Sequence, residues 1–312
     1  MWNWKTIGGI LLASCCFPYV VTLGWTGDIN GSSKVLEPSD PKLVSGRQVV
    51  LDRDKVTSMD VEQYLVGAVA QQIPEAYAPE AIKAQAVIAR TYIYGQMGDR
   101  REITESELDM DYLEQGQMEK KWGTKAYMEF YEKIEEAVAQ TNGQVMEYEG
   151  EPIDAWFCRL SAGRTRPGDE AHPYLASVDC PEDLKADGYL QIREWLPDEF
   201  SRLISQIPDG GPVSADQVPS KIQIGERDEA GYVSLVQIGD YPFTGDAVRY
   251  GLGLASPYFR FEDYEGNVRA VVKGIGHGYG LSQHTADRKA KEGWTYDQIL
   301  KYFYQNIMLV SE

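Results

Sequence analysis

Residues 64–92, YLVGAVAQQIPEAYAPEAIKAQAVIARTY, constrain the fold of this chain more than any other segment. The second half, 80–92, is apolar on nearly every side of the helix that its residues favour. A helix without a solvated face is buried, so the rest of the chain has to form a core around it. Its polar side chains Lys83, Gln85 and Arg90 then need partners, because buried charges are paired and buried amides are hydrogen-bonded. The alternative is a core helix whose few polar groups point outward at one end.

The net charge restricts the classes of partner. The chain has 48 acidic and 30 basic residues, which give a net charge of −18. Without a basic stripe to neutralise phosphates, nucleic-acid binding is disfavoured. The same sign of charge repels anionic wall polymers, so any contact with a glycan has to rest on hydrogen bonds and aromatic stacking.

The first 26 residues predict a membrane anchor. Lys5 precedes an uncharged run over residues 6–26 that is long enough to span a bilayer as a helix, with Trp2 and Trp25 at the two interface levels. The positive-inside rule then puts the N-terminus in the cytoplasm and the rest outside, as in a single-pass protein of the cell membrane. A cleaved signal peptide, or lipoprotein cleavage at Cys15, is the competing interpretation.

The pattern of helices and strands predicts an α+β fold. We expect antiparallel hairpins packed with helices in one large domain, with two lobes around a groove as a variant, preceded by a single N-terminal transmembrane helix. The expected parts are a cytoplasmic tip and anchor over 1–26, a linker over 27–46 and a domain over 47–312. Residues 100–123 are acidic and irregular in pattern, and we expect them to be the most variable surface feature.

Helices and hairpins are expected at definite places in the domain. A strand is expected over 48–52, and helices over 60–70, 80–98, 124–142, 197–207, 281–292 and 295–306. Three hairpins are expected, pairing 144–148 with 153–157, 221–227 with 232–238, and 258–261 with 268–272.

Four sequence blocks, taken together, resemble the stage II sporulation protein D family, also called the amidase-enhancer family. They are residues 64–92, FCRLSAGRT at 157–165, PYLASV at 173–178, and GIGHGYGLSQ at 274–283, the last followed by GWTY at 293–296. The resemblance implies an extracytoplasmic, membrane-anchored protein that acts on peptidoglycan glycan strands. It also implies a cell-wall amidase and other engulfment membrane proteins as candidate partners.

The chain departs from this family at one position. Sporulation members act as lytic transglycosylases and have a glutamate as the acid, in a Glu-Met-Pro type sequence, whereas this chain has Gln72 there. The acid protonates the glycosidic oxygen and then takes a proton from the muramic acid 6-hydroxyl, and an amide can do neither. The sequence therefore predicts either a lytic transglycosylase-type protein with lost or altered catalysis, or a non-catalytic glycan-binding module that recruits or enhances an amidase. Glu75, Glu80, Asp169 and Glu170 are alternative acids.

The resemblance, with the chemistry of the side chains, gives a set of candidate site residues. The catalytic candidates are Gln72, Glu80 and His277, where His277 either positions or relays a proton or else fixes a tight turn. The substrate-binding candidates are polar or glycine positions in the four blocks: Lys83, Arg90, Tyr92, Ser161, Gly163, Thr165, Gly276, Gly278, Ser282 and Gln283.

The cysteines and histidines indicate no metal site. Cys158 and Cys180 lie outside the expected anchor, and the spacing of cysteines and histidines fits no zinc motif. We expect no metal and no cofactor. For the two cysteines the alternatives are a disulfide, in an oxidising compartment, or Cys158 as a small buried apolar residue on a strand.

Overall fold

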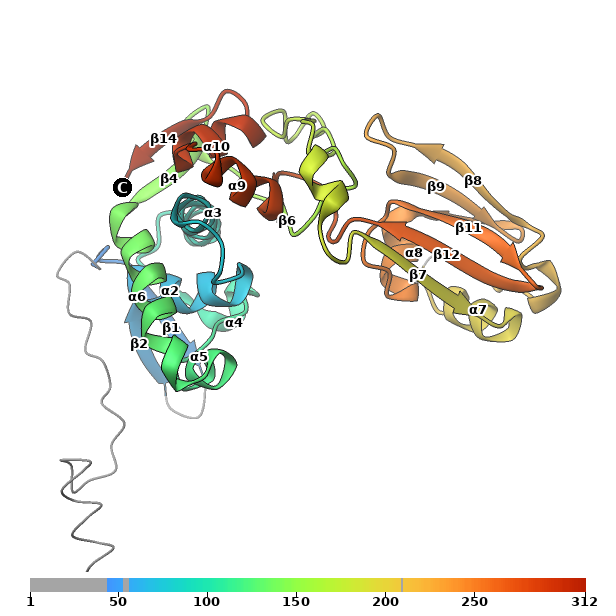
Figure 1. Ribbon diagram of the computed structural model, residues 1–312, viewed down its shortest axis with the longest axis horizontal. Helices are drawn as coiled ribbons and strands as arrows, with labels where there is room; N and C mark the ends of the chain where they lie inside the picture. The colour runs from blue at the N-terminus through green and yellow to red at the C-terminus, as the bar shows by residue number, and fades with distance from the viewer. Residues whose placement is uncertain (1–43, 53–55, 209) are drawn as a thin grey trace, which may run out of the picture. The chain divides into compact units, whose positions relative to one another are not determined.

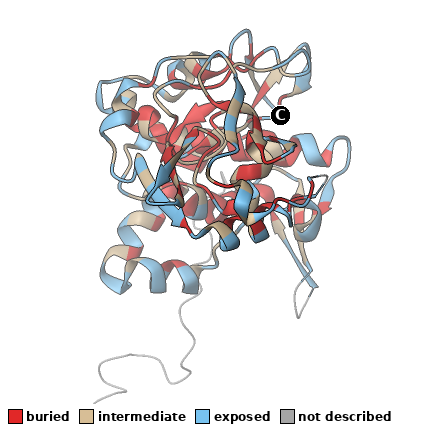
Figure 2. Ribbon diagram, turned by 90° about the vertical axis from the view of Figure 1, so that its right-hand side faces the viewer, coloured by how far each residue is buried: buried red, intermediate tan, exposed pale blue. Residues whose placement is uncertain are grey.

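The computed structural model describes residues 44–52, 56–208 and 210–312. Residues 42–312 form one compact unit of mixed helices and strands. Its arrangement of antiparallel hairpins and packed helices confirms the α+β expectation. Figure 2 shows that buried residues gather in the interior and that the outer surfaces of the helices are exposed.

Helix α3 (Pro79–Met97) is the central element of the first group of elements. It packs against α2 (Val61–Gln72), α6 (Thr124–Gln140), α9 (Gln283–Lys291) and α10 (Tyr296–Phe303), which lie around it in Figure 1. The apolar residues of α3 that the sequence predicted to be buried are all inaccessible or nearly so: Ala81, Ile82, Ala84, Ala86, Val87, Ile88 and Ala89. The helix is thus buried on all sides, as the absence of a solvated face requires.

Arg90 and Glu62 form a fully buried ion pair between α3 and α2. Both side chains are 0 % exposed, and the guanidinium donates two hydrogen bonds of 2.7 Å to the carboxylate. Its remaining donors reach Thr141 Oγ1 at 3.4 Å and the carbonyl oxygens of Val138 and Gln144 at 3.3 and 3.1 Å. All five N–H donors of the guanidinium are therefore used inside the protein. The expectation that Arg90 binds substrate is wrong, because the side chain faces no solvent.

Short strands complete the first group. β1 (Gln48–Asp52) pairs antiparallel with β2 (Val56–Asp60) and parallel with β3 (Glu102–Thr104). A second sheet joins the C-terminal β14 (Met308–Ser311) to β4 (Gln144–Tyr148) and β5 (Glu151–Pro152), and a third pairs β6 (Phe157–Cys158) with β13 (Leu281–Ser282). These pairings bring the C-terminal segment and the 144–158 segment against α3.

A second group of elements, within residues 181–273, has a hydrophobic cluster of its own. Two three-stranded sheets form it. The first sheet has the strand order β11 (Phe259–Tyr264), β12 (Asn267–Lys273), β7 (Leu190–Trp195). The second has the strand order β10 (Tyr241–Thr244), β9 (Val233–Ile238), β8 (Ile222–Arg227). Helices α7 (Pro197–Ile204) and α8 (Gly245–Leu252) pack with them, as Figure 1 shows, and η2 (Ala215–Gln217) is a single 3-10 turn. The 3-10 turn η1 (Pro181–Lys185) packs instead against α9.

Most expected elements are confirmed, with shifted ends. The strand at 48–52, the six helices and the second and third hairpins are present. The first hairpin is wrong in its second strand: β4 pairs with β5 at residues 151–152, and the expected strand over 153–157 does not form, because residues 157–158 belong to β6 and pair with β13. Residues 100–123, for which the sequence pattern predicted no element, contain β3, α4 (Glu105–Leu108) and α5 (Gln115–Trp122). Capping boxes at Thr104 and Glu114 begin these short helices, which have too few apolar residues for a periodic signal.

The transmembrane part of the expected fold class is corrected. Across the described residues, no helix of the structure has both the length and the apolar character needed to cross a membrane. The fold class is therefore an α+β domain without such a helix in the part of the chain that the structure describes. The expected anchor over 1–26 and most of the linker over 27–46 lie outside the described residues.

Removing the buried ion pair should destabilise the protein strongly. We expect Arg90→Ala to lower the free energy of unfolding by about 3–5 kcal/mol, because it leaves the Glu62 carboxylate buried without its partner. Chemical denaturation of the full-length protein measures this. Lys83→Ala, which breaks a partly exposed pair with Glu80 on the same helix, is the matched control and should cost less than about 1 kcal/mol. Equal costs for the two variants would contradict this account.

Candidate functional site

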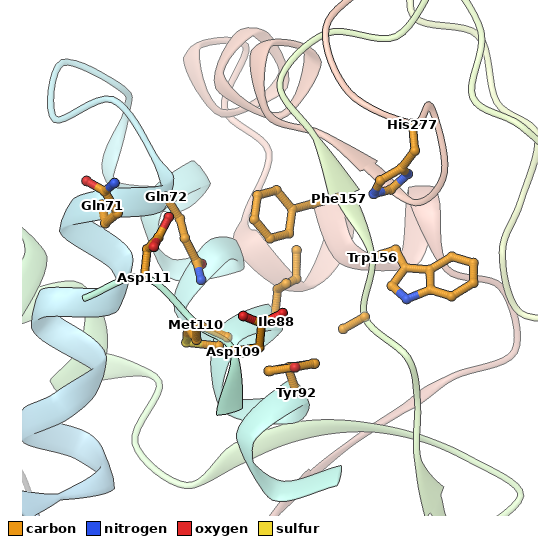
Figure 3. Close-up of a pocket in the computed structure, with 12 residues that line it drawn as sticks. Gln71, Gln72, Ile88, Tyr92, Asp109, Met110, Asp111, Trp156, Phe157 and His277 are labelled. Carbon is orange, nitrogen blue, oxygen red and sulfur yellow. The ribbon is translucent and has the colours of Figure 1, made fainter. Parts of the chain in front are cut away.

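A cavity of about 370 Å³ lies beside the end of α2 and the middle of α3. Its wall combines the last residues of α2, one face of α3, the turn after α4 and the strand entering β6. Figure 3 shows most of the side chains that surround it. The lining residues are Gln71, Gln72, Ile88, Ala89, Tyr92, Asp109, Met110, Asp111, Ala155, Trp156, Phe157 and His277. The structure therefore brings together Gln72, Tyr92 and His277 from the residues predicted by sequence.

Gln72 is held in the wall by two other glutamines. Gln85 Nε2 donates to Gln72 Oε1 at 2.8 Å. Gln283 Nε2 donates to the backbone carbonyl oxygen of Gln72 at 2.8 Å and to Gln85 Oε1 at 3.1 Å. Gln85 and Gln283 are buried, whereas Gln72 is partly exposed to the pocket. Gln283 therefore acts through Gln72 rather than by facing the pocket.

His277 lies at the other side of the cavity, in the glycine-rich segment before β13. Its Nδ1 accepts a hydrogen bond of 3.1 Å from the backbone N–H of Tyr279. Burial, reinforced by the charge of Arg249, lowers the pKa of His277 to about 4. The imidazole is therefore neutral at neutral pH, and its proton is on Nε2, because Nδ1 is occupied as an acceptor.

Aromatic side chains form the apolar part of the pocket. Trp156 directly precedes β6, Phe157 is its first residue, and Tyr92 comes from α3. The Trp156 ring packs edge-on to His277, with ring centroids 6.1 Å apart. Aromatic faces beside a few polar groups are typical of sites that bind ligands through stacking and directed hydrogen bonds.

Two carboxylates that the sequence analysis missed, Asp109 and Asp111, stand at the rim. The turn that carries them is held to α2 and α3: Tyr92 Oη donates to the carbonyl oxygen of Leu108 at 2.7 Å and Tyr64 Oη to that of Met110 at 3.2 Å. Asp109 ends α4 in the left-handed region, at φ 44°. Both aspartates are exposed. No local pattern predicts this position, because the turn reaches the pocket only through tertiary contacts.

The polar residues of the Ser161 turn do not reach the pocket. Ser161, Thr165 and Ser282 are 0 % exposed. The hydroxyls of Ser161 and Ser282 each donate to Asp183 Oδ2 at 2.7 Å, and Thr165 Oγ1 donates to the carbonyl oxygen of Ala176 at 2.8 Å. Burial raises the pKa of Asp183, against these donors. The expected substrate-binding role of the three hydroxyls is thus corrected to a structural one.

The three glycine candidates are needed for the backbone conformation. Gly163, Gly276 and Gly278 have φ values of 108°, 111° and 88°, which side-chain-bearing residues rarely adopt. A Cβ at Gly278 would lie 2.4 Å from the Tyr232 ring. Gly276 and Gly278 let the chain turn tightly on either side of His277, Gly163 does the same in the Ser161 turn, and none of the three lines the cavity.

The alternative acids also lie outside the cavity lining. Glu80 bonds Lys83 at 2.5 Å and accepts from the backbone N–H of Tyr296 at 2.8 Å, so these two residues fix the start of α3. Asp169 accepts from His172 Nδ1 at 2.6 Å in an exposed turn. Glu75 and Glu170 are likewise absent from the lining. None of these four carboxylates lines the cavity beside Gln72.

Cys158 and Cys180 are free thiols, both buried. Cys158 is therefore a small buried residue on strand β6, the second of the two alternatives, and it forms no disulfide with Cys180. Burial raises the pKa of both thiols, which keeps them protonated and unreactive. Within the described residues, no group of three or more histidine, cysteine, aspartate or glutamate side chains is arranged to hold a metal ion.

Comparisons with known proteins match this chain to sporulation proteins. The family profile described as "Stage II sporulation protein" matches residues 52–148. Stage II sporulation protein D of Bacillus subtilis is 31% identical over 266 residues, covering 81% of this chain and 75% of that protein. The protein of the same name from Bacillus amyloliquefaciens is 32% identical, covering 81% and 74%. A protein named amidase enhancer, from Bacillus subtilis, is 23% identical over 79% of this chain and 40% of its own length.

The depressed pKa of His277 should make the protein less stable in acid. Below pH 6.5 the unfolded chain takes up a proton at this residue that the folded protein does not bind until about pH 4. Stability therefore falls as pH falls through this window, by up to about 3 kcal/mol from this group. We expect His277→Asn, whose side-chain oxygen can still accept from Tyr279, to remove much of that fall. Denaturant titrations at pH 7 and pH 4.5 measure it. An unchanged pH dependence in the variant would refute this assignment.

Proposed function

Because the chain belongs to the stage II sporulation protein D family, we propose that its pocket binds peptidoglycan glycan strands during the cell-wall remodelling of sporulation. The observation that supports this most is the composition of the pocket: three aromatic rings beside neutral amide and imidazole groups. Uncharged sugars are bound by such surfaces through stacking and hydrogen bonds. A net charge of −18 excludes attraction of the anionic strand as a whole.

The finer proposal is a lytic transglycosylase-type site without its acid. Gln72 occupies the position where the resemblance places the glutamate, and its amide carries no proton that it can transfer at working pH. The remaining alternative acids point elsewhere, and neutral His277 is a hydrogen-bond donor rather than an acid. We therefore infer that the pocket holds a glycan strand without cleaving it by the family's mechanism. Since peptidoglycan lies outside the cytoplasm, the proposal puts the domain there.

Enhancement of a cell-wall amidase is a second candidate function. It is supported by the similarity to the amidase enhancer of Bacillus subtilis. A module that binds a glycan strand without cutting it could bring an amidase to the wall or hold the strand for it. The test is whether the full-length protein increases peptide release by an amidase on intact walls.

The aromatic wall gives a direct test of glycan binding. We expect full-length protein to bind peptide-stripped glycan strands in a pull-down or calorimetric titration, and Trp156→Ala to weaken that binding by about tenfold, because a stacking face is lost. The matched control is Trp294→Ala, which removes a partly buried tryptophan at a separate surface pocket. Equal losses in the two variants, or no binding by the wild type, would rule out the pocket as the glycan site.

Restoring a carboxylate should restore cleavage. In Gln72→Glu, one carboxylate oxygen keeps the hydrogen bond from Gln85 Nε2 and the other faces the pocket as a proton donor and acceptor. We expect this variant to release anhydro-muramic ends from peptide-stripped strands at least about 100-fold faster than the wild type, the smaller effect ascribed to general acid–base catalysis. Mass spectrometry of the products measures this. Rapid cleavage by the wild type would show that another group is the acid.

A further inference from the structure

His172 is a partly buried histidine whose two ring nitrogens both face carboxylates. Nδ1 lies 2.6 Å from Asp169 Oδ1, and Nε2 lies 3.2 Å from Asp154 Oδ2. The two aspartate side chains are 72 % and 52 % exposed to water, so they are anions that can only accept hydrogen bonds. A neutral imidazole has one N–H and can donate to only one of them. The two hydrogen bonds therefore coexist only when His172 is the charged imidazolium.

The chain around His172 holds the ring between these carboxylates. Asp169 Oδ1 also accepts from the backbone N–H groups of Ala171 and His172, at 3.1 and 3.0 Å, so it organises the turn that carries the histidine. Asp154 lies two residues before Trp156, in the segment between β5 and β6. The hydrogen bond from His172 to Asp154 thus ties the 169–172 turn to the segment that carries Trp156.

Trp156 is the cavity residue against which the His172 ring packs. The two ring centroids are 4.5 Å apart and the planes are inclined at 37°, whereas His277 and Tyr279 meet the indole edge-on at 6.1 and 5.5 Å. A cation at the distance of His172 is attracted to the π-electrons of an indole. Figure 3 shows Trp156 and His277 across the cavity from Gln72, so His172 supports the wall opposite Gln72.

The groups that face the His172 ring are Asp154, Asp169, Trp156 and Tyr174, the last with ring centroids 6.0 Å apart. Burial raises the pKa of Tyr174, which keeps it neutral, and the hydrogen bond from His172 lowers the pKa of Asp169, which keeps it charged. Histidine is the residue type in this contact that changes charge near neutral pH. When the ring loses a proton, one nitrogen presents a lone pair to a carboxylate and the attraction to the indole is lost.

We propose that charged His172 is a positioning residue, which holds the Trp156 indole as a stacking surface, so that the pocket binds a glycan strand more tightly when this histidine is protonated than when it is neutral. This rests on the proposed glycan binding and adds regulation by pH to the same pocket. His172 is not among the residues that line the cavity, so it acts through Trp156 and does not touch the ligand.

Calorimetric titrations of the full-length protein with peptide-stripped glycan strands, at about pH 5.5 and about pH 8.5, test the proposal. We expect the wild type to bind about fivefold more tightly at the lower pH, the effect of one cation–π contact. His277 does not contribute over this range, because its pKa is about 4. His172→Gln should bind with the weaker affinity at both pH values. His172→Arg keeps a planar cation between the two carboxylates and should bind with the tighter affinity at both.

Trp156→Ala separates positioning from a direct effect of the charge on the strand. Its residual binding should be the same at both pH values, because the indole through which His172 acts is gone. His284→Gln is the matched control: it removes a partly buried histidine of α9 that is outside the cavity lining, and it should keep the pH dependence of the wild type. The proposal is overturned if the wild type binds equally at both pH values, or if His172→Gln or Trp156→Ala keeps the pH dependence.

The charge of His172 is measured without a glycan. The chain has three histidines, so labelling histidine with ¹⁵N gives three imidazole rings to follow by NMR, and His172→Gln identifies the signals of His172. We expect two N–H groups on this ring at about pH 5.5 and one at about pH 8.5. One N–H at both pH values refutes the positioning role and leaves glycan binding intact. If the ring is charged as expected but strands bind at neither pH, the proposed function fails and the positioning role fails with it.

Discussion

The buried ion pair of Arg90 and Glu62 is the interaction on which the first group of elements depends. It joins α3 to α2, and the other guanidinium hydrogen bonds reach the end of α6 and the start of β4. A charge buried this deeply is tolerated only when every donor is used, which forces the four elements into one relative arrangement. The position of Gln72 follows, because it is the last residue of the helix that Glu62 fixes near its start.

The sequence predicted the parts of the fold that short-range chemistry determines. The burial of α3 follows from its composition, Asp60 caps α2, and turns such as Glu265–Gly266 close hairpins that form as expected. The elements within 100–123 were missed because their short helices contain few apolar residues. Arg90 was recognised as needing a partner, but only the packing of α2 identifies Glu62 as that partner and removes Arg90 from the site.

The candidate site was predicted less completely than the fold, because tertiary contacts decide which residues line the cavity. Gln72, Tyr92 and His277 were identified and converge on one cavity. Ser161 and Ser282 belong to motifs of the resemblance, yet their hydroxyls serve Asp183 inside the protein. A motif indicates that a residue matters and does not tell whether it contacts a ligand or supports the residues that do. The rim aspartates belong to no motif, so only the packing of their turn against Tyr64 and Tyr92 reveals them.

The glutamine network accommodates either a glutamate or a glutamine at position 72 at little structural cost. Gln85 Nε2 donates to whatever oxygen residue 72 presents, so a glutamate and a glutamine satisfy the same buried donor. The two residues differ only at the atom facing the pocket, which is an oxygen in one case and an N–H donor in the other. Substitution there changes the chemistry offered to a ligand while leaving the core hydrogen bonds intact. An amide at position 72 is therefore compatible with a folded pocket, and under the proposed function what it removes is the transfer of the proton.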